Sequence, residues 1–276
     1  MKRLPLQKRF AKSGLSALTW FVGLAFFFPI FWIILISFRH ESDAGTFPPK
    51  WLAHIVFTNY TSVFKKGAST FLLNSAIASI GSTIIVLLLA YPAAYALSIK
   101  PIYRNKDVLT FFLSTKFLPP IAALLPLYLI LQHLHVLDNI WALMVLYVSM
   151  NLPLSVWMLR SFLKEIPPEI VEAAELDGAS TSAILVKVLA PISLPGLAAT
   201  ALICFIFSWN EFLLAINVTG FHAATAPVYL VGFVTAEGLF FAHLAAVSIV
   251  VSLPVVIAGW AAQDKLVRGL SLGAVK

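Results

Sequence analysis

Residues 160–195 read RSFLKEIPPEIVEAAELDGASTSAILVKVLAPISLP, a polar stretch between two runs that are apolar enough to span a bilayer. Its acidic residues outnumber its two lysines and are Glu165, Glu169, Glu172, Glu175 and Asp177. Pro167 and Pro168 suit the first turn of a helix, where a missing N–H is no loss, and Gly178 suits a helix end. The stretch therefore predicts a helix of about ten residues that begins at the prolines and ends at the glycine.

A second short helix is predicted to follow the glycine. Ser180 or Thr181 can cap its N-terminus, and Pro191 and Pro195 are predicted to close it. Small side chains would let a partner surface approach the backbone of the first helix closely: Ala173, Ala174 and Gly178. Because a two-turn helix is marginal alone, we expect this helix–turn–helix to dock against another surface.

The composition is that of an integral membrane protein. Hydrophobic residues make up 60% of the 276 residues, charged residues make up 11%, and the mean hydropathy is +0.93, whereas soluble domains carry about 25% charged residues. The net charge of +7 does not indicate nucleic-acid binding, because the basic residues flank apolar runs and form no patch with aromatic residues. A single cysteine, Cys204, cannot form an intrachain disulfide.

Hydrophobic runs of the length that crosses a bilayer predict six transmembrane helices. They cover residues 15–38, 72–97, 108–131, 140–160, 193–216 and 242–262. Residues 39–70 are more polar and are expected to form an ordered external loop with a short helix near Asn59–Lys66. The fold class is therefore an all-α membrane protein, with the polar stretch between its fourth and fifth helices.

The distribution of lysine and arginine predicts the orientation in the membrane. Most of these residues near span ends lie on the side of the N-terminus, and those on the other side are Arg39, Lys50, Lys65 and Lys66. Both termini and the polar stretch are therefore expected in the cytoplasm. This divides the chain into a basic N-terminus (1–14), a six-helix domain (15–263) with a cytoplasmic loop (161–191), and a tail (264–276).

The polar stretch also resembles a known family. Glu172-Ala173-Ala174, then Gly178, then Val188-Leu189-Ala190-Pro191 is similar to the EAA loop of the permease subunits of ABC importers, although Val188 and Ala190 depart mildly from the usual Ile-x-Leu-Pro ending. In that family the loop is the coupling helix that enters a groove on the ATPase subunit. The resemblance implies an ATPase contact formed by Glu169, Glu172, Ala173, Ala174, Asp177, Gly178 and Ala179.

Other stretches resemble the carbohydrate-importing branch of the family. Trp209-Asn210-Glu211 is similar to its Trp-Asn-(Glu/Asp) element, and residues 266–276 resemble its C-terminal tail, which implies further ATPase contacts by Arg268, Gly269, Gly273 and Lys276. Residues 114–119 and 237–241 are similar to mannitol and sorbitol permeases. The resemblance implies import of a sugar alcohol, with a di- or oligosaccharide or a glycerol-phosphate-type substrate as the alternative.

The resemblance also implies the partners. They are a second homologous permease, two ATPase subunits that bind ATP and magnesium, and an extracytoplasmic substrate-binding protein, all at a bacterial inner membrane. The chain itself has no phosphate-binding G-x-x-x-x-G-K-[ST] string. We therefore expect a non-catalytic subunit that binds no cofactor, no metal and no nucleic acid.

Charged and amide side chains within the predicted spans are candidates for the translocation pathway. They are Lys116, Asn151, Asn210 and Glu211. Charge within a bilayer is costly, so Lys116 and Glu211 are expected to face a cavity or a partner. Their depths differ by about 12–15 Å at 1.5 Å rise per residue, which favours separate roles, with a salt bridge between the two spans as the alternative.

Two other classes of protein fit the sequence less well. An ion-driven secondary transporter would show an internal repeat and several intramembrane carboxylates, whereas Glu211 is the one carboxylate within the predicted spans. A membrane enzyme would need a catalytic constellation, and none is present. His133 and His135 with Asp138 could begin a metal site, but no further ligand lies near them in sequence, so an interfacial loop pair is favoured.

Overall fold

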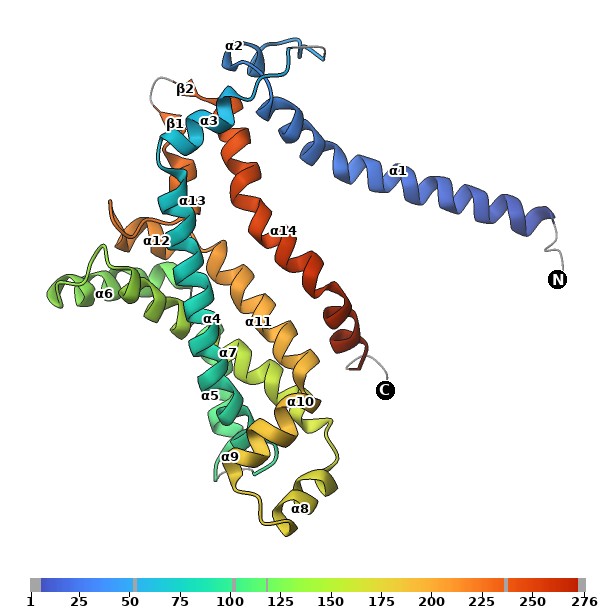
Figure 1. The fold of residues 1–276 in the computed structure, drawn as a ribbon, viewed down its shortest axis with the longest axis vertical. Helices are drawn as coiled ribbons and strands as arrows, with labels where there is room; N and C mark the ends of the chain where they lie inside the picture. The colour runs from blue at the N-terminus through green and yellow to red at the C-terminus, as the bar shows by residue number, and fades with distance from the viewer. Residues whose placement is uncertain (1–5, 52–53, 101–102, 118, 236–237, 273–276) are drawn as a thin grey trace. The chain divides into compact units, whose positions relative to one another are not determined.

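The computed structural model describes residues 6–51, 54–100, 103–117, 119–235 and 238–272, and the side chains of 14–51, 54–100, 103–117, 119–234 and 240–263. Helices dominate these residues, and one antiparallel pair of two-residue strands joins β1 (Val234–Thr235) to β2 (Gly238–Leu239). The described residues divide into two compact units, one from residues up to Gly67 together with Gly232–Val250, the other from the remainder. Figure 1 shows the elements.

The first unit contains α1 (Leu6–Ser37), α2 (Glu41–Ala44), α3 (Thr58–Lys65), the strand pair and the start of α14 (Phe241–Leu272). The predicted short helix at Asn59–Lys66 corresponds to α3. The Nδ2 of Asn59 donates to the carbonyl oxygens of Ser37 (2.8 Å) and Arg39 (2.7 Å), so α3 satisfies carbonyl groups at the end of α1. The Glu41 carboxylate in turn accepts from the backbone N–H groups of Ala242 and His243.

The second unit is built on three long helices. They are α4 (Ala68–Ser98), α7 (Ile140–Lys164) and α11 (Leu194–Trp209), which run side by side in Figure 1. The shorter elements are α5 (Asn105–Phe117), α6 (Pro120–His133), α8 (Pro168–Leu176), α9 (Thr181–Ala183), the π-helix η1 (Ile184–Leu189), α10 (Ala190–Ile192), α12 (Leu213–Val218) and α13 (Ala226–Val231).

Small and hydroxyl-bearing residues let these three helices approach closely. Gly196 faces Phe162, and a Cβ at Gly196 would lie 2.4 Å from Cγ of that ring. The hydroxyl of Ser208 contacts that of Ser82 at 3.1 Å and accepts from Nδ2 of Asn151 at 2.9 Å, so α4, α7 and α11 share a buried polar junction. In a membrane such groups must be satisfied within the protein.

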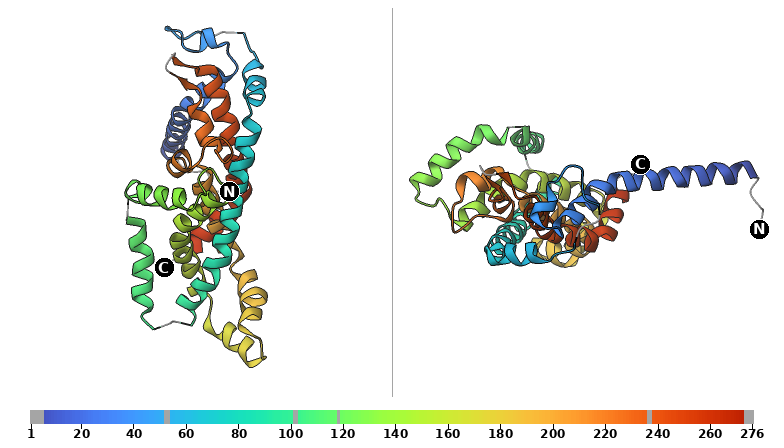
Figure 2. Two further views of the ribbon diagram at one scale, coloured as in Figure 1. Left: turned by 90° about the vertical axis from the view of Figure 1, so that its left-hand side faces the viewer. Right: turned by 90° about the horizontal axis from the view of Figure 1, so that it is seen from above.

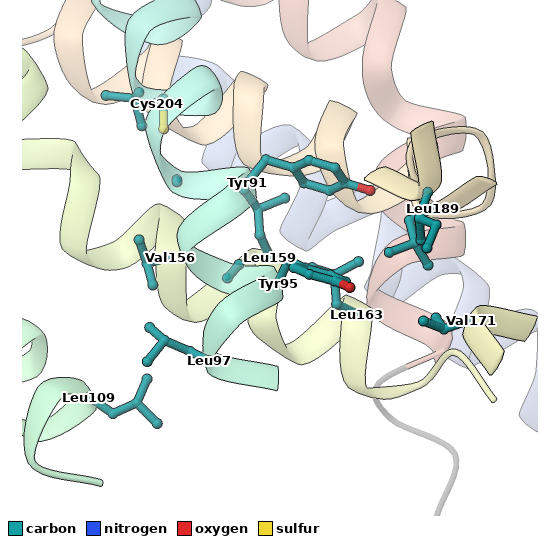
Figure 3. Close-up of a cluster of buried hydrophobic side chains, with 14 residues drawn as sticks. Tyr91, Tyr95, Leu97, Leu109, Val156, Leu159, Leu163, Val171, Leu189 and Cys204 are labelled. Carbon is teal, nitrogen blue, oxygen red and sulfur yellow. The ribbon is translucent and has the colours of Figure 1, made fainter. Parts of the chain in front are cut away.

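A buried apolar cluster lies between the loop of residues 161–191 and the long helices. Figure 3 shows Tyr91 and Tyr95 of α4, Leu163 of α7, Leu189 of η1 and Val171 of α8 within it. The cluster therefore packs α8 and η1 against α4 and α7.

Two of the six predicted spans are not single straight helices. Four described helices are long and apolar enough to cross a membrane, and the number rises to six if each of two bent helix pairs is one span. The predicted span 108–131 consists of α5 and α6, which differ in direction by 92°, with residue 118 between them outside the described part (Figure 2). Pro119 has extended backbone angles before Pro120, as expected for a residue that precedes proline.

The second bent pair is Thr181–Ile192 with α11, at 84°. The predicted span 193–216 is interrupted at another point, because α11 ends at Trp209 and α12 begins at Leu213. Asn210 ends α11, and its Nδ2 donates to the carbonyl oxygen of Ile206 at 2.9 Å. Asn151 makes the same contact with the Tyr147 carbonyl oxygen within the uninterrupted α7, so this bond alone does not cause the interruption.

The second predicted helix ends between its two prolines, and the structure differs from the prediction in detail. The helical path that begins at Thr181 runs through Pro191 to Ile192, and Pro195 lies in the first turn of α11 instead of closing the earlier helix. The wide π turn before Pro191 tolerates its missing N–H. The backbone of α14 continues through Gly269 to Leu272, since one glycine costs a long helix only about 1 kcal/mol.

We expect Gly196→Ala to destabilise the chain by about 1–3 kcal/mol, because the new methyl group would force the Phe162 ring out of the α7–α11 contact. Thermal unfolding of the purified protein in detergent measures this loss. Gly259→Ala in α14 is the control, because no atom lies within 4 Å of the added Cβ. Equal unfolding temperatures for both variants would contradict the close approach.

Candidate functional site

A cavity of about 400 Å³ lies in the second unit between α5, α6, α7 and the segment that joins α11 to α12. Its wall is mostly apolar but includes four side chains with polar groups: Thr115, Lys116, Ser149 and Glu211. The apolar part of the wall comes from residues such as Pro120, Met150, Pro153, Leu213 and Leu214. This size is typical of small-molecule pockets.

Lys116 reaches the cavity from the last turn of α5. Its Nζ donates to the backbone carbonyl oxygen of Met150 in α7, so the side chain joins the two helices across the cavity wall. An ammonium group has three N–H donors. Lys116 can therefore keep this bond and still donate to a molecule in the cavity.

Glu211 stands at the interruption between α11 and α12. Its Oε1 accepts from the backbone N–H of Leu214 (2.8 Å) and its Oε2 from that of Ala215 (3.1 Å). The carboxylate therefore caps the N-terminus of α12, where negative charge is favoured. It lines the same cavity as Lys116, yet no ion pair joins the two among the described side chains.

The two amide candidates lie elsewhere. Asn151 is 1% exposed and donates to the Tyr147 carbonyl oxygen and to Ser208, within the junction of the long helices. Asn210 ends α11, and neither asparagine is among the residues that line the cavity. Of the four pathway candidates, the structure thus brings together Lys116 and Glu211.

The acidic loop presents one face of α8 to the outside. Val171 is 5% exposed and packs in the apolar cluster, whereas Leu176 is 89% exposed. The exposed residues of α8 are Pro168, Glu169, Glu172, Ala173, Glu175 and Leu176. Four of them, Glu169, Glu172, Ala173 and Leu176, recur at the spacing of one helix face. This acidic face of α8, with Ala173 and Leu176 towards its end, is therefore accessible to another protein.

The end of α8 is a Schellman motif. Gly178 has φ +78°, its N–H donates to the Glu175 carbonyl oxygen, and the Ala179 N–H donates to that of Ala174, both at 3.0 Å. Asp177 is the C-cap residue. Glycine suits this position because most L side chains avoid this backbone conformation.

Glu175 differs from the other acidic residues of the loop, because it pairs with Lys100 at 2.7 Å. The hydrogen bond with Glu175 raises the pKa of Lys100. In the tail, the backbone of Arg268 and Gly269 belongs to α14, while Gly273 and Lys276 lie outside the described residues.

Sequence reasoning missed the role of Asp138. Its carboxylate accepts from the backbone N–H groups of Gly220, His222 and Ala223, the first of which is 82 residues away. The sequence holds no signal for such a contact, since any residue can supply a backbone N–H. In the described part of the chain, no cluster of three potential ligands supports a metal site with His133 and His135.

Residues 104–268 match the family model described as "Binding-protein-dependent transport system inner membrane component". The chain is 35% identical over 270 residues to the probable ABC transporter permease protein y4oR of Sinorhizobium fredii, with 97% of each chain covered. It is 32% identical over 255 residues to the trehalose transport system permease protein SugB of Mycobacterium tuberculosis, covering 90% of this chain and 92% of that one.

Among solved structures, a bacterial ABC transporter involved in the import of the acidic polysaccharide alginate contains a similar chain. The TM-score is 0.79 at 23% identity, with 96% of this chain and 99% of that chain covered. This likeness shows that the two chains share a fold.

We expect the effects of Lys116→Met and Glu211→Gln on the free energy of unfolding to add within about 0.5 kcal/mol, because each side chain bonds separate backbone groups. Denaturant unfolding of both single variants and the double variant measures the coupling. A double variant that regains the stability lost in the singles would instead establish a direct ion pair.

Proposed function

Because this chain belongs to the family of binding-protein-dependent transport system inner membrane components, we propose that it forms half of the pathway of an ATP-driven importer for a carbohydrate. It is a non-catalytic subunit in the inner membrane. The observation that carries the proposal is the family match itself, which spans both the Lys116 cavity and the loop of α8.

The proposed substrate is a di- or oligosaccharide. The relative from Mycobacterium tuberculosis is named as a trehalose permease, and trehalose is a disaccharide. The sugar alcohol suggested by residues 114–119 and 237–241 has no such support. The cavity suits hydroxyl-rich ligands, because Thr115, Lys116 and Ser149 bring hydrogen-bonding groups to an otherwise apolar wall.

The exposed face of α8 is the proposed contact with an ATPase subunit. Glu169, Glu172 and Ala173 lie on that face, and its negative charge favours a groove that contains lysine or arginine. In this assignment both termini and α8 are cytoplasmic, in agreement with the distribution of basic residues. The tail from Arg268 to Lys276, including Gly269 and Gly273, is assigned to the same side and to the same ATPase subunits.

The full assembly in this proposal contains a second homologous permease, two ATPase subunits with ATP and magnesium, and an extracytoplasmic binding protein that delivers the substrate. The family description, a binding-protein-dependent transport system, supports the last of these partners. Movement of the ATPase subunits reaches the membrane helices through α8, whose Val171 packs in the apolar cluster with α4 and α7.

The first test is uptake by the complete complex in proteoliposomes. We expect ATP inside the vesicles, together with the binding protein, to drive accumulation of labelled trehalose or maltose in preference to mannitol or sorbitol. Accumulation of the sugar alcohols alone would restore the polyol assignment. Uptake driven by an ion gradient in the absence of ATP would overturn the importer class.

The second prediction concerns the end of α8. Gly178→Val should abolish most ATP-coupled uptake, because a β-branched residue in the left-handed region costs about 1–2 kcal/mol or more and opens the Schellman motif. Gly178→Asn should keep uptake, since asparagine visits this conformation. Gly178→Asp tests the effect of charge separately from backbone strain, because aspartate also tolerates the left-handed conformation but adds a negative charge.

Uptake and substrate-stimulated ATP hydrolysis are measured on the same preparations, with the amount of assembled complex as the reference. Normal uptake by the Gly178→Val complex would show that the end of α8 is not part of the coupling contact.

A further inference from the structure

The short helix α12 is held at both ends by carboxylates from outside it. At its N-terminus, Glu211 accepts from Leu214 and Ala215. Just beyond its C-terminus, Oδ1 of Asp138 accepts from the backbone N–H groups of Gly220 (2.7 Å) and Ala223 (2.9 Å). A six-residue helix is too short to be stable alone, so these contacts and packing determine where it lies.

Asp138 accepts hydrogen bonds through its side chain and donates one through its backbone. Its Oδ2 accepts from the His222 N–H at 3.0 Å, and its own N–H donates to the carbonyl oxygen of Val218, the last residue of α12, at 2.9 Å. Its backbone has φ +54°, a conformation that aspartate tolerates better than most residues. Burial alone would raise the pKa of Asp138, but the N–H donors outweigh it and lower the pKa, so the group is ionised at neutral pH.

The segment that follows α12 is also tied to α4. The Nδ2 of Asn74 donates to the carbonyl oxygens of His222 (2.8 Å) and Ala224 (3.0 Å), and the Ser75 hydroxyl accepts from the Ala226 N–H at 2.8 Å. These two residues hold the far part of the segment. Asp138 alone among the described side chains holds the part next to α12, at Gly220.

The position of α12 shapes the cavity. Leu213 and Leu214 of α12 line it beside Glu211. Leu214, Ala215 and Val218 of α12 also pack into an apolar cluster with residues of α4, α6 and α7. The wall of the cavity therefore moves whenever α12 moves.

We propose that Asp138 is a positioning residue, a latch that keeps α12 in place as one wall of the cavity, and that release of the latch lets this wall move. The transport meaning of the latch rests on the proposed function, in which the cavity belongs to the pathway. The latch itself is a property of this chain and can be tested without substrate, ATP or partner subunits.

The test is hydrogen exchange of the full chain in lipid nanodiscs, read by mass spectrometry over residues 212–223. We expect Asp138→Asn to speed exchange there by roughly tenfold, because hydrogen bonds to a charged acceptor are individually worth about a tenfold change or more. The amide of asparagine also turns N–H donors towards backbone N–H groups. Exchange in α4, α7 and α11 should stay unchanged.

A second measurement, the reaction rate of a thiol at the cavity, reports movement of the cavity wall. Ser149→Cys in a Cys204→Ala background places the one thiol at the cavity, and its reaction with a thiol reagent should quicken in the Asp138→Asn variant. The native Cys204, which is 2% exposed between the long helices, reports global opening in a separate sample and should not react faster.

Two variants complete the design. Gly220→Ala would place a Cβ 3.2 Å from Oδ2 of Asp138, so it should produce a smaller change in the same direction even if Asp138→Asn fails to fold. Asp107→Asn makes the same chemical change at an exposed pair with Arg104 and should change neither readout.

Faster exchange confined to residues 212–223, with faster Ser149→Cys reaction, supports the latch. Unchanged exchange in both Asp138→Asn and Gly220→Ala overturns it. Equal acceleration across the long helices, or faster reaction of Cys204, also overturns it, because Asp138 would then serve stability of the whole unit.

Discussion

A break in a helix within a membrane exposes backbone groups that no water can satisfy, so each break must bring its own hydrogen-bond partners. At the end of α11, Asn210 donates to the Ile206 carbonyl oxygen and Glu211 accepts from two N–H groups of α12. Polar side chains that are costly within a membrane thus form hydrogen bonds with backbone groups at the break. Glu211 also lines the cavity, so the interruption and part of the polar wall occur at the same residue.

The features with local causes could be predicted from the sequence. Apolar run length located the long helices, and Pro168 and Gly178 marked the start and the end of α8 because a missing N–H and a left-handed conformation are properties of single residues. The breaks in two spans could not be located in this way. Prolines and asparagines are tolerated in membrane helices, and whether they interrupt one depends on neighbours that the sequence does not specify.

The candidate site shows the same division. That Lys116 and Glu211 face a cavity followed from the cost of burying charge, but spacing along the spans did not predict that they share one cavity. Asp138 was considered only as a metal ligand, because its true partners are backbone N–H groups of a distant segment. Polarity alone predicts a pathway role for Asn151, whereas in the structure its Nδ2 donates to Ser208 in a buried junction of three helices.

The attachment of α8 to the long helices has a consequence for its salt dependence. Val171 is buried among residues of α4, α7 and η1, and Lys100 at the end of α4 pairs with Glu175. The ion pair is exposed and salt screens it. Burial of Val171, worth about 1.5–3 kcal/mol, is therefore the energetically stronger connection. The attachment of α8 to the buried cluster therefore depends mainly on apolar burial, which physiological salt does not weaken.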